Sequence, residues 1–170
     1  MRVLGIDPGT AVLGYGVVES SPARHPRLVE CGTLTTRARD PLPARLRLIH
    51  DGITALIARH DPDALAVESA FYGRNVRTTV VLSHARGVIL LAGEEAGIAI
   101  AEYSPALIKK TVVGRGAALK PQVSYMVARL LRLKSAPEPS DAADGVAVAL
   151  THLLVTTRQV AFFHPVGGAR

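Results

Sequence analysis

The stretch GIDPGT, residues 5–10, is followed almost at once by VLGYGVVE, residues 12–19, and these two segments decide the fold. A short apolar run that begins at Val3 ends abruptly on Asp7, and a Pro-Gly pair then turns the chain. Apolar segments on both sides of so tight a turn predict two antiparallel strands. Asp7 has two interpretations at this point. It caps the turn, or a rigid strand presents it to a metal ion.

The rest of the chain predicts one mixed α/β sheet of five strands with helices on both faces. The expected strands cover residues 2–7, 14–19, 27–34, 64–67 and 98–103, and the expected helices begin near residues 41, 76, 104, 120 and 140. The fourth and fifth strands each follow a helix, so they can run parallel to the first. We expect the helix at 120 to end near Leu133 and the last helix near Thr157. The prediction is a single domain over residues 1–157 and a short, mobile, Gly-rich tail over residues 158–170.

Composition excludes several classes of protein. The chain has 170 residues, of which 48% are hydrophobic and 20% charged, so it is not a disordered chain. Its net charge of +6 suggests a polyanionic partner, most often nucleic acid. Cys31 is the single cysteine, which fits the reducing cytoplasm. The apolar runs are too short to span a bilayer, and the first residues do not read as a signal peptide, so we expect no membrane association.

Four carboxylates follow or begin predicted elements. Asp7 and Glu68 each end an apolar strand, and parallel neighbours would bring both to one edge of the sheet. Asp141 and Asp144 are three residues apart, so they share one face of the first helical turn. Taken alone, that pair is also explained by the helix dipole, which favours acids there, and Glu68 by an ordinary surface position. Together, four clustered carboxylates need a cation, and oxygen ligands suit Mg²⁺ or Mn²⁺.

Five segments in this order resemble the RuvC family of crossover junction endodeoxyribonucleases, the Holliday junction resolvases. They are GIDPGT with GYG, VESAFYGRN, HARG, IKKTVVGRGAALKPQV and SDAADGVAVALTH. The resemblance implies an RNase H-like fold and a homodimer that nicks two opposed strands of a four-way DNA junction. It assigns the catalytic and metal-ligand roles to Asp7, Glu68, Asp141 and Asp144. It also implies two Mg²⁺ ions per site, replaceable by Mn²⁺, products with 5′-phosphate and 3′-hydroxyl ends, and the branch-migration proteins RuvA and RuvB as partners.

Two stretches without acidic residues predict a DNA-binding surface. No Asp or Glu occurs in residues 103–137 or 70–93, although both stretches carry several basic residues. The alternative is a solvated helix face. The residues expected to contact DNA are Phe71, Tyr72, Arg74, Lys109, Lys110, Arg115 and Lys120. By resemblance, Lys109 and Lys120 lie near the active centre and Phe71 stacks on a base; ordinary packing under a loop is the alternative for the two aromatic residues.

Two positions depart from the family pattern, and a third varies among relatives. Gly145 stands where alanine is usual, and a glycine inside a helix costs ~1 kcal/mol relative to alanine. Pro121 replaces a polar residue at the expected start of a helix, a position that proline tolerates. Some relatives carry His at the position of Asp141. We therefore expect Asp141 to be the least essential of the four ligands.

Three other functions are open on the residues alone. The Asp7-Pro8-Gly9-Thr10 turn also resembles the phosphate loop of actin-like ATPases, which need a second domain. A DNA-binding module without catalysis would lack one of the acids, and all four are present. A ribonuclease of RNase H type would share the fold and acids but read 2′-hydroxyls.

Overall fold

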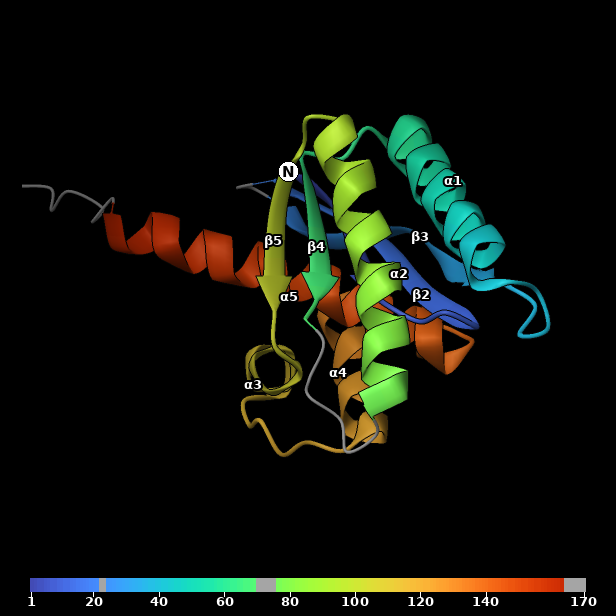
Figure 1. Cartoon of the computed structure of the whole chain (residues 1–170). Helices are drawn as coiled ribbons and strands as arrows, with labels where there is room; N and C mark the ends of the chain where they lie inside the picture. The colour runs from blue at the N-terminus through green and yellow to red at the C-terminus, as the bar shows by residue number, and fades with distance from the viewer. Residues whose placement is uncertain (22–23, 70–75, 164–170) are drawn as a thin grey trace, which may run out of the picture.

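The fold is a five-stranded sheet with helices packed on both faces (Figure 1). The computed structural model describes residues 1–21, 24–69 and 76–163. Its strands are β1 (Arg2–Asp7), β2 (Val12–Ser21), β3 (Arg24–Thr35), β4 (Ala64–Glu68) and β5 (Ala99–Tyr103). Its helices are α1 (Leu42–His60), α2 (Val76–Glu95), α3 (Pro105–Val113), α4 (Lys120–Leu130) and α5 (Ser140–Phe163).

The strand order, β3-β2-β1-β4-β5, determines which strand ends lie together. β2 is antiparallel to both β1 and β3, whereas β4 is parallel to β1 and β5 is parallel to β4. Four strands, β1, β3, β4 and β5, therefore run in the same direction and finish at one edge of the sheet. We call this the site edge. The mixed sheet and the parallel course of the fourth and fifth strands confirm the expectation from sequence.

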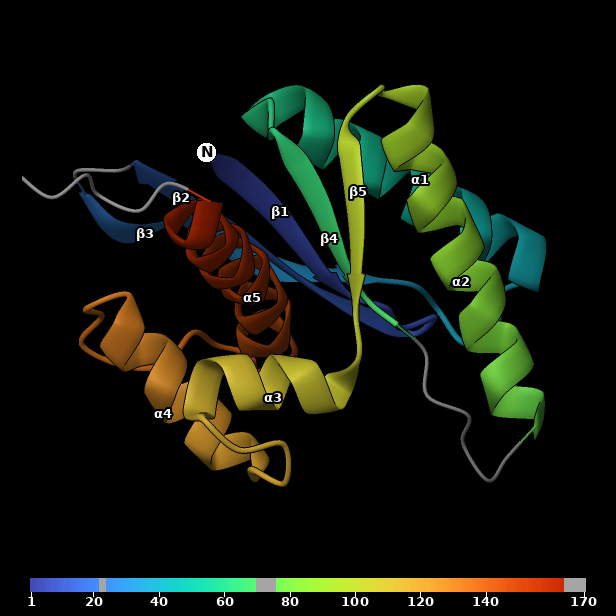
Figure 2. The ribbon, with the colours of Figure 1, turned by 90° about the vertical axis from the view of Figure 1, so that its left-hand side faces the viewer.

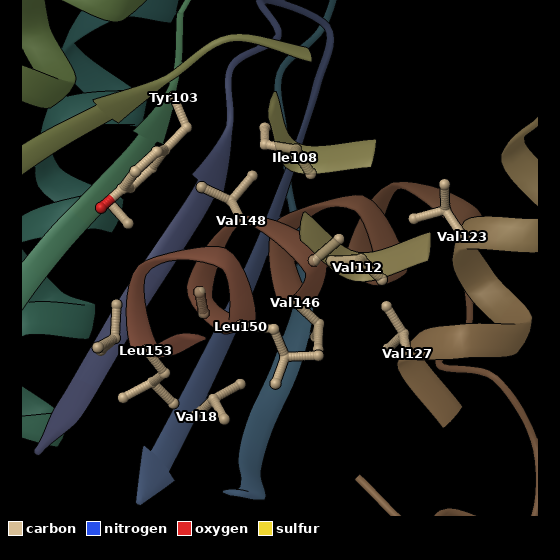
Figure 3. Packing of buried hydrophobic residues seen from close by; sticks show 14 of the residues in the cluster. Val18, Tyr103, Ile108, Val112, Val123, Val127, Val146, Val148, Leu150 and Leu153 are labelled. Atoms are coloured by element: carbon tan, nitrogen blue, oxygen red, sulfur yellow. The ribbon is translucent and has the colours of Figure 1, made fainter. Parts of the chain in front are cut away.

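The two faces of the sheet carry different helices (Figure 2). α1 and α2 cover one face, while α5 crosses the other and is backed by α3 and α4. Each face has its own hydrophobic cluster. Figure 3 shows the cluster on the α5 face. There Val146, Val148 and Leu150 of α5 lie among side chains from β2, β5, α3 and α4. The sheet is thus held rigidly between two apolar layers.

The alternation of side chains along β1 sets the direction of Asp7. Leu4 and Ile6 pack into the cluster under α1 and α2, and Val3 packs into the cluster under α5. Successive residues of a strand point to opposite faces. Asp7 therefore lies on the α5 side of the sheet, at the end of a strand whose preceding residues are buried.

Two helix ends predicted from the sequence are wrong. The helix that begins at Lys120 ends at Leu130 instead of Leu133, because Arg132 adopts a left-handed conformation with φ 54°. α5 continues to Phe163 and passes the expected end at Thr157, since the first helix breaker after that point in the sequence is Pro165. α5 begins at Ser140, as expected, and the carbonyl of Pro139 accepts its first helical hydrogen bond, from Ala142. The mobile tail over residues 158–170 stays a prediction. Within the described residues, each helix is too short or too polar to cross a bilayer.

Candidate active site

The site forms because α5 approaches the backbone of β1 and β2 very closely. Gly5 of β1 faces Ala149 and Gly145 of α5, and a Cβ at Gly5 would overlap their backbone atoms. A Cβ at Gly145 would lie 2.5 Å from the Cα of Tyr15 in β2. Glycines on both sides of this contact let the helix lie against the strands without intervening side chains. The first turn of α5 is thereby carried to the end of β1.

Four carboxylates meet at the site edge. Asp7, Asp141 and Asp144 each offer an oxygen, and these oxygens all lie within 4.8 Å of one another. Glu68, which ends the neighbouring parallel strand β4, shares a hydrogen bond with Asp7. The structure thus brings together all four acids predicted from the sequence. Two of them stand on rigid strands and two near the N-terminus of one helix, α5.

The electrostatics of the cluster favour a bound cation. Burial, followed by the charge of Asp144, raises the pKa of Asp7 to about 6. Burial and the charge of Asp7 raise the pKa of Glu68 to about 7. Carboxyl groups in such a place hold protons near neutral pH unless another positive charge replaces them. A divalent ion is the charge that suits an all-oxygen donor set.

Lys109 and Lys120 lie beside the acids, as predicted. The Nζ of Lys120, at the start of α4, donates to Oδ2 of Asp144 at 2.8 Å, and this bond raises the pKa of the lysine. Lys109 of α3 is half-buried, and its charge lowers the pKa of Glu68. The first turn of α4 is compatible with Pro121, and the Gln122 side chain accepts from the Leu119 amide. Nothing in the sequence indicates which acid pairs with Lys120.

The other predicted DNA contacts fall into two groups. Lys110 of α3 and Arg115 of the loop before α4 are exposed, on the same segment as the two lysines of the site. Phe71, Tyr72 and Arg74 lie outside the described residues. His152 of α5 is a packed residue: it is buried, and its Nδ1 lies 2.8 Å from the Tyr103 hydroxyl.

A set of hydrogen bonds behind the site was not predicted from the sequence. The turn after Asp7 is tied to the end of β3, where the Thr36 amide donates to the Ala11 carbonyl at 2.9 Å. The Thr36 hydroxyl donates to the carbonyl of Thr10 and accepts from Nε of Arg45 in α1, at 2.9 Å. These hydrogen bonds fix the turn that begins at Asp7. No motif in the sequence announces them, because they join segments about 26 residues apart.

The donor set limits the chemistry of the site. Carboxylate oxygens with an adjacent ammonium group can hold one or two hard divalent ions and a phosphate. The described cluster contains no thiolate or imidazole, the ligands typical of zinc sites. The arrangement fits metal-assisted hydrolysis of a phosphodiester.

Comparison with known proteins gives one consistent answer. The family model described as crossover junction endodeoxyribonuclease RuvC matches residues 3–152. The curated RuvC of Syntrophomonas wolfei is 48% identical over 153 residues, covering 90% of this chain and 88% of its own. Among solved structures, Thermus thermophilus RuvC has a TM-score of 0.85 at 37% identity and covers 94% of this chain and 97% of its own.

A second structure, of T. thermophilus RuvC in complex with a Holliday junction substrate, has a TM-score of 0.84 at 35% identity, over 93% of this chain and 96% of its own. The yeast mitochondrial resolvase Ydc2 shares the fold, with a TM-score of 0.63 at 16% identity, and covers 95% of this chain and 85% of its own. The RNase H-like fold expected from the sequence is confirmed. The chain belongs to the RuvC family of crossover junction endodeoxyribonucleases.

Proposed function

We propose that this protein is a Holliday junction resolvase, which nicks two opposed strands of a four-way DNA junction by metal-dependent hydrolysis. The observation that carries the proposal is the meeting of Asp7, Glu68, Asp141 and Asp144 at one rigid edge of the sheet. The close relationship to RuvC proteins, one of which is solved with a Holliday junction substrate, supports the choice of DNA structure.

The four carboxylates would hold two Mg²⁺ ions, for which Mn²⁺ can substitute. When bound, such ions activate the attacking water and stabilise the leaving oxygen of the phosphodiester, which leaves 5′-phosphate and 3′-hydroxyl ends. Burial raises the pKa of Asp7 and of Glu68, so a bound cation would stabilise the ionised form of these two carboxyl groups. Asp141 completes the set, and its replacement by His in some relatives makes it the most replaceable ligand.

The protein's own groups position the substrate strand. Lys120 orients Asp144 through their hydrogen bond, and its other two N–H groups remain able to donate to phosphate oxygens. Lys109 approaches the cluster from α3, on the Glu68 side. Lys110 and Arg115 extend the positive surface along the same segment. Phosphate contacts of this kind fix the position of the backbone without reading its sequence.

An apolar groove along α2 provides a surface for a second copy of the chain. The groove has a volume of about 680 Å³. Its lining residues are Leu46, Val76, Thr79, Val80, Ser83, His84, Gly87, Val88 and Leu91. Val76, Val80 and Leu91 are exposed in the protomer, at 74%, 48% and 50%. A two-fold dimer formed through α2 would bury them and present two active sites to two opposed strands.

The remaining proposals concern the cellular setting. A recombination intermediate in chromosomal DNA places the enzyme in the cytoplasm, and the branch-migration proteins RuvA and RuvB are the partners that the family relationship implies. Fractionation and affinity purification of a chromosomally tagged copy test both statements.

The direct test of substrate uses three nucleic acids of matched sequence: a mobile four-way junction, a linear duplex and an RNA–DNA hybrid. Each is incubated with the protein in the presence and absence of Mg²⁺. The proposal predicts paired, symmetric nicks in the junction alone and none without metal. Cleavage of the hybrid or indifferent cleavage of duplex would replace the proposed substrate, and binding of the junction without cleavage would identify a binding module.

A further inference from the structure

The loop after β3 places unpaired arginines at the site edge. Residues 36–41, which we call the arginine loop, follow β3 at the edge where β1 and β4 also end. Arg37 and Arg39 are exposed, and within the described part of the chain neither forms an ion pair or a side-chain hydrogen bond. Five other arginines do pair with carboxylates: Arg2 and Arg27 with Glu19, Arg47 with Asp51, Arg59 with Glu30, and Arg86 with Glu102.

The arginine loop is held at a fixed position relative to Asp7. Thr36 bonds to the carbonyls of Thr10 and Ala11, in the turn that Asp7 begins, and Arg45 donates to the Thr36 hydroxyl. A turn closed by the Asp40 amide and the Arg37 carbonyl, 3.0 Å apart, then shapes the loop. Thr36, which makes these hydrogen bonds, directly precedes Arg37. The two guanidinium groups therefore extend from a segment whose backbone is held in place.

The strand order arranges charge along the site edge. From β5 toward β3, the edge carries Lys109 in α3 after β5, then Glu68, then Asp7, and finally the arginine loop. Cations therefore lie at both ends of the edge and carboxylates in the middle. The loop contains one acid, Asp40, which forms no ion pair with either arginine among the described residues. A polyanionic strand lying along this edge meets positive charge on both sides of the metal-binding acids.

We propose that Arg37 and Arg39 bind backbone phosphates of the DNA strand on the far side of the scissile phosphate from Lys109 and Lys120. The inference rests on the proposed function and adds a second phosphate contact to the same site. Neighbouring strands lie about 4.8 Å apart, so β3 ends about 10 Å from β1. The contacted phosphates therefore lie within a few nucleotides of the cut.

The test compares Arg37→Gln/Arg39→Gln with wild type in binding to a four-way junction, with Ca²⁺ replacing Mg²⁺ to prevent cleavage. We expect the Kd to rise roughly tenfold and the salt dependence, d log K/d log[salt], to become less steep by about two. The control is Arg27→Gln/Arg59→Gln, which removes the same charge at the opposite edge of the sheet and should leave both quantities near wild type. Both arginines of each pair are exposed, and thermal melting verifies that the variants fold.

A second measurement locates the contact. Neutral methylphosphonates replace single phosphates one at a time within a few nucleotides of the cut, on either side. We expect one of these positions to weaken binding of wild type and to leave binding of Arg37→Gln/Arg39→Gln unchanged. Unaltered affinity and salt slope in Arg37→Gln/Arg39→Gln would overturn the inference, and so would an equal loss of affinity in Arg27→Gln/Arg59→Gln. In either case, junction binding by wild type would leave the proposed function intact. A wild-type protein that does not bind the junction would overturn both.

Discussion

The backbone of Gly145 in α5 contacts the backbone of Tyr15 in β2, so closely that an added Cβ would be 2.5 Å from the Cα of Tyr15. The contact determines how near the first turn of α5 comes to Asp7. Alanine is the better helix former by ~1 kcal/mol, yet here its methyl group would displace α5 from the sheet. In this chain the close packing of α5 on β2 therefore favours glycine, in spite of its cost to the helix.

We expect Gly145→Ala to lower the free energy of unfolding by roughly 1–3 kcal/mol, as overpacking usually does. It should also weaken Mg²⁺-dependent cleavage, because Asp141 and Asp144 move with the helix. Urea unfolding and single-turnover cleavage measure the two effects. Gly87→Ala is the control for the urea measurement alone: it also lies inside a helix, and a Cβ there meets no atom of the same protomer within 4 Å, but it lines the α2 groove. Its stability should stay level or rise, and a more stable Gly145→Ala would refute the packing explanation.

Lys120 should affect catalysis more than binding. It donates to Asp144 at 2.8 Å and is one of several cations at the site edge. Lys120→Gln is expected to slow single-turnover cleavage of the junction by roughly 10²–10³-fold, the usual effect of removing one charge-stabilising donor. Junction affinity in Ca²⁺ should fall only a few-fold. Lys134→Gln removes the same charge from an exposed position after α4 and should cut normally. An unchanged rate in Lys120→Gln would exclude it from the active site.

The raised pKa values of Asp7 and Glu68 predict a dependence of stability on pH. Their pKa values are about 6 and about 7 in the folded protein without metal, and near 4 when unfolded. Between these values the folded state binds more protons, so this contribution to the free energy of unfolding falls as pH rises. We expect Mg²⁺ to raise the Tm more at about pH 8 than at about pH 5, because it replaces the lost protons.

The pH effect is measured as the Tm of wild type, Asp7→Asn and Asp63→Asn at each pH, once in EDTA and once in Mg²⁺. Asp7→Asn should lose part of the destabilisation at high pH and most of the Mg²⁺ response. Asp63→Asn is the control, since Asp63 is 63% exposed and bonds the Arg2 amide at the opposite edge of the sheet. Equal Mg²⁺ responses in wild type and Asp7→Asn would place the metal elsewhere.

The groove along α2 predicts a variant that separates assembly from chemistry. Val80→Asp puts a charge into the apolar lining of the groove, and we expect a folded monomer by analytical ultracentrifugation. Such a monomer should lose the paired nicking of opposed strands. Leu48→Asp, on α1 outside the groove and 53% exposed, should remain a dimer. A dimeric Val80→Asp would assign the interface to another surface.

The sequence predicts the two strand-end acids because their positions follow from simple geometry. Asp7 and Glu68 end parallel neighbouring strands, and such strands finish at one edge. Asp141 and Asp144 share a face of a helix, but periodicity does not say where that helix docks. Their clustering with Asp7 and Glu68 is a hypothesis on the residues alone, and the family resemblance assigns all four acids to one site. The glycines that let α5 pack on the sheet occur in GYG and at Gly145. Helix propensity, however, predicts only that Gly145 destabilises the helix, and does not reveal its role in packing.

Other features depend on contacts between distant segments. The arginine loop reaches the site edge because β3 lies two strands from β1 and runs parallel to it.

The ends of α4 and α5 differ from the prediction for local reasons. A left-handed Arg132 ends α4 early, and the lack of a helix breaker before Pro165 lets α5 continue.

The most direct test of the central claim is the single-turnover rate at which wild type, Asp7→Asn and Asp63→Asn cleave a four-way junction in Mg²⁺. We expect Asp7→Asn to lose at least about 10³-fold in rate, since one ligand of the metal cluster is lost, while it still binds the junction in Ca²⁺. Asp63→Asn should cut like wild type. Cleavage by Asp7→Asn at a rate close to wild type would contradict the assignment of the active site to this edge of the sheet.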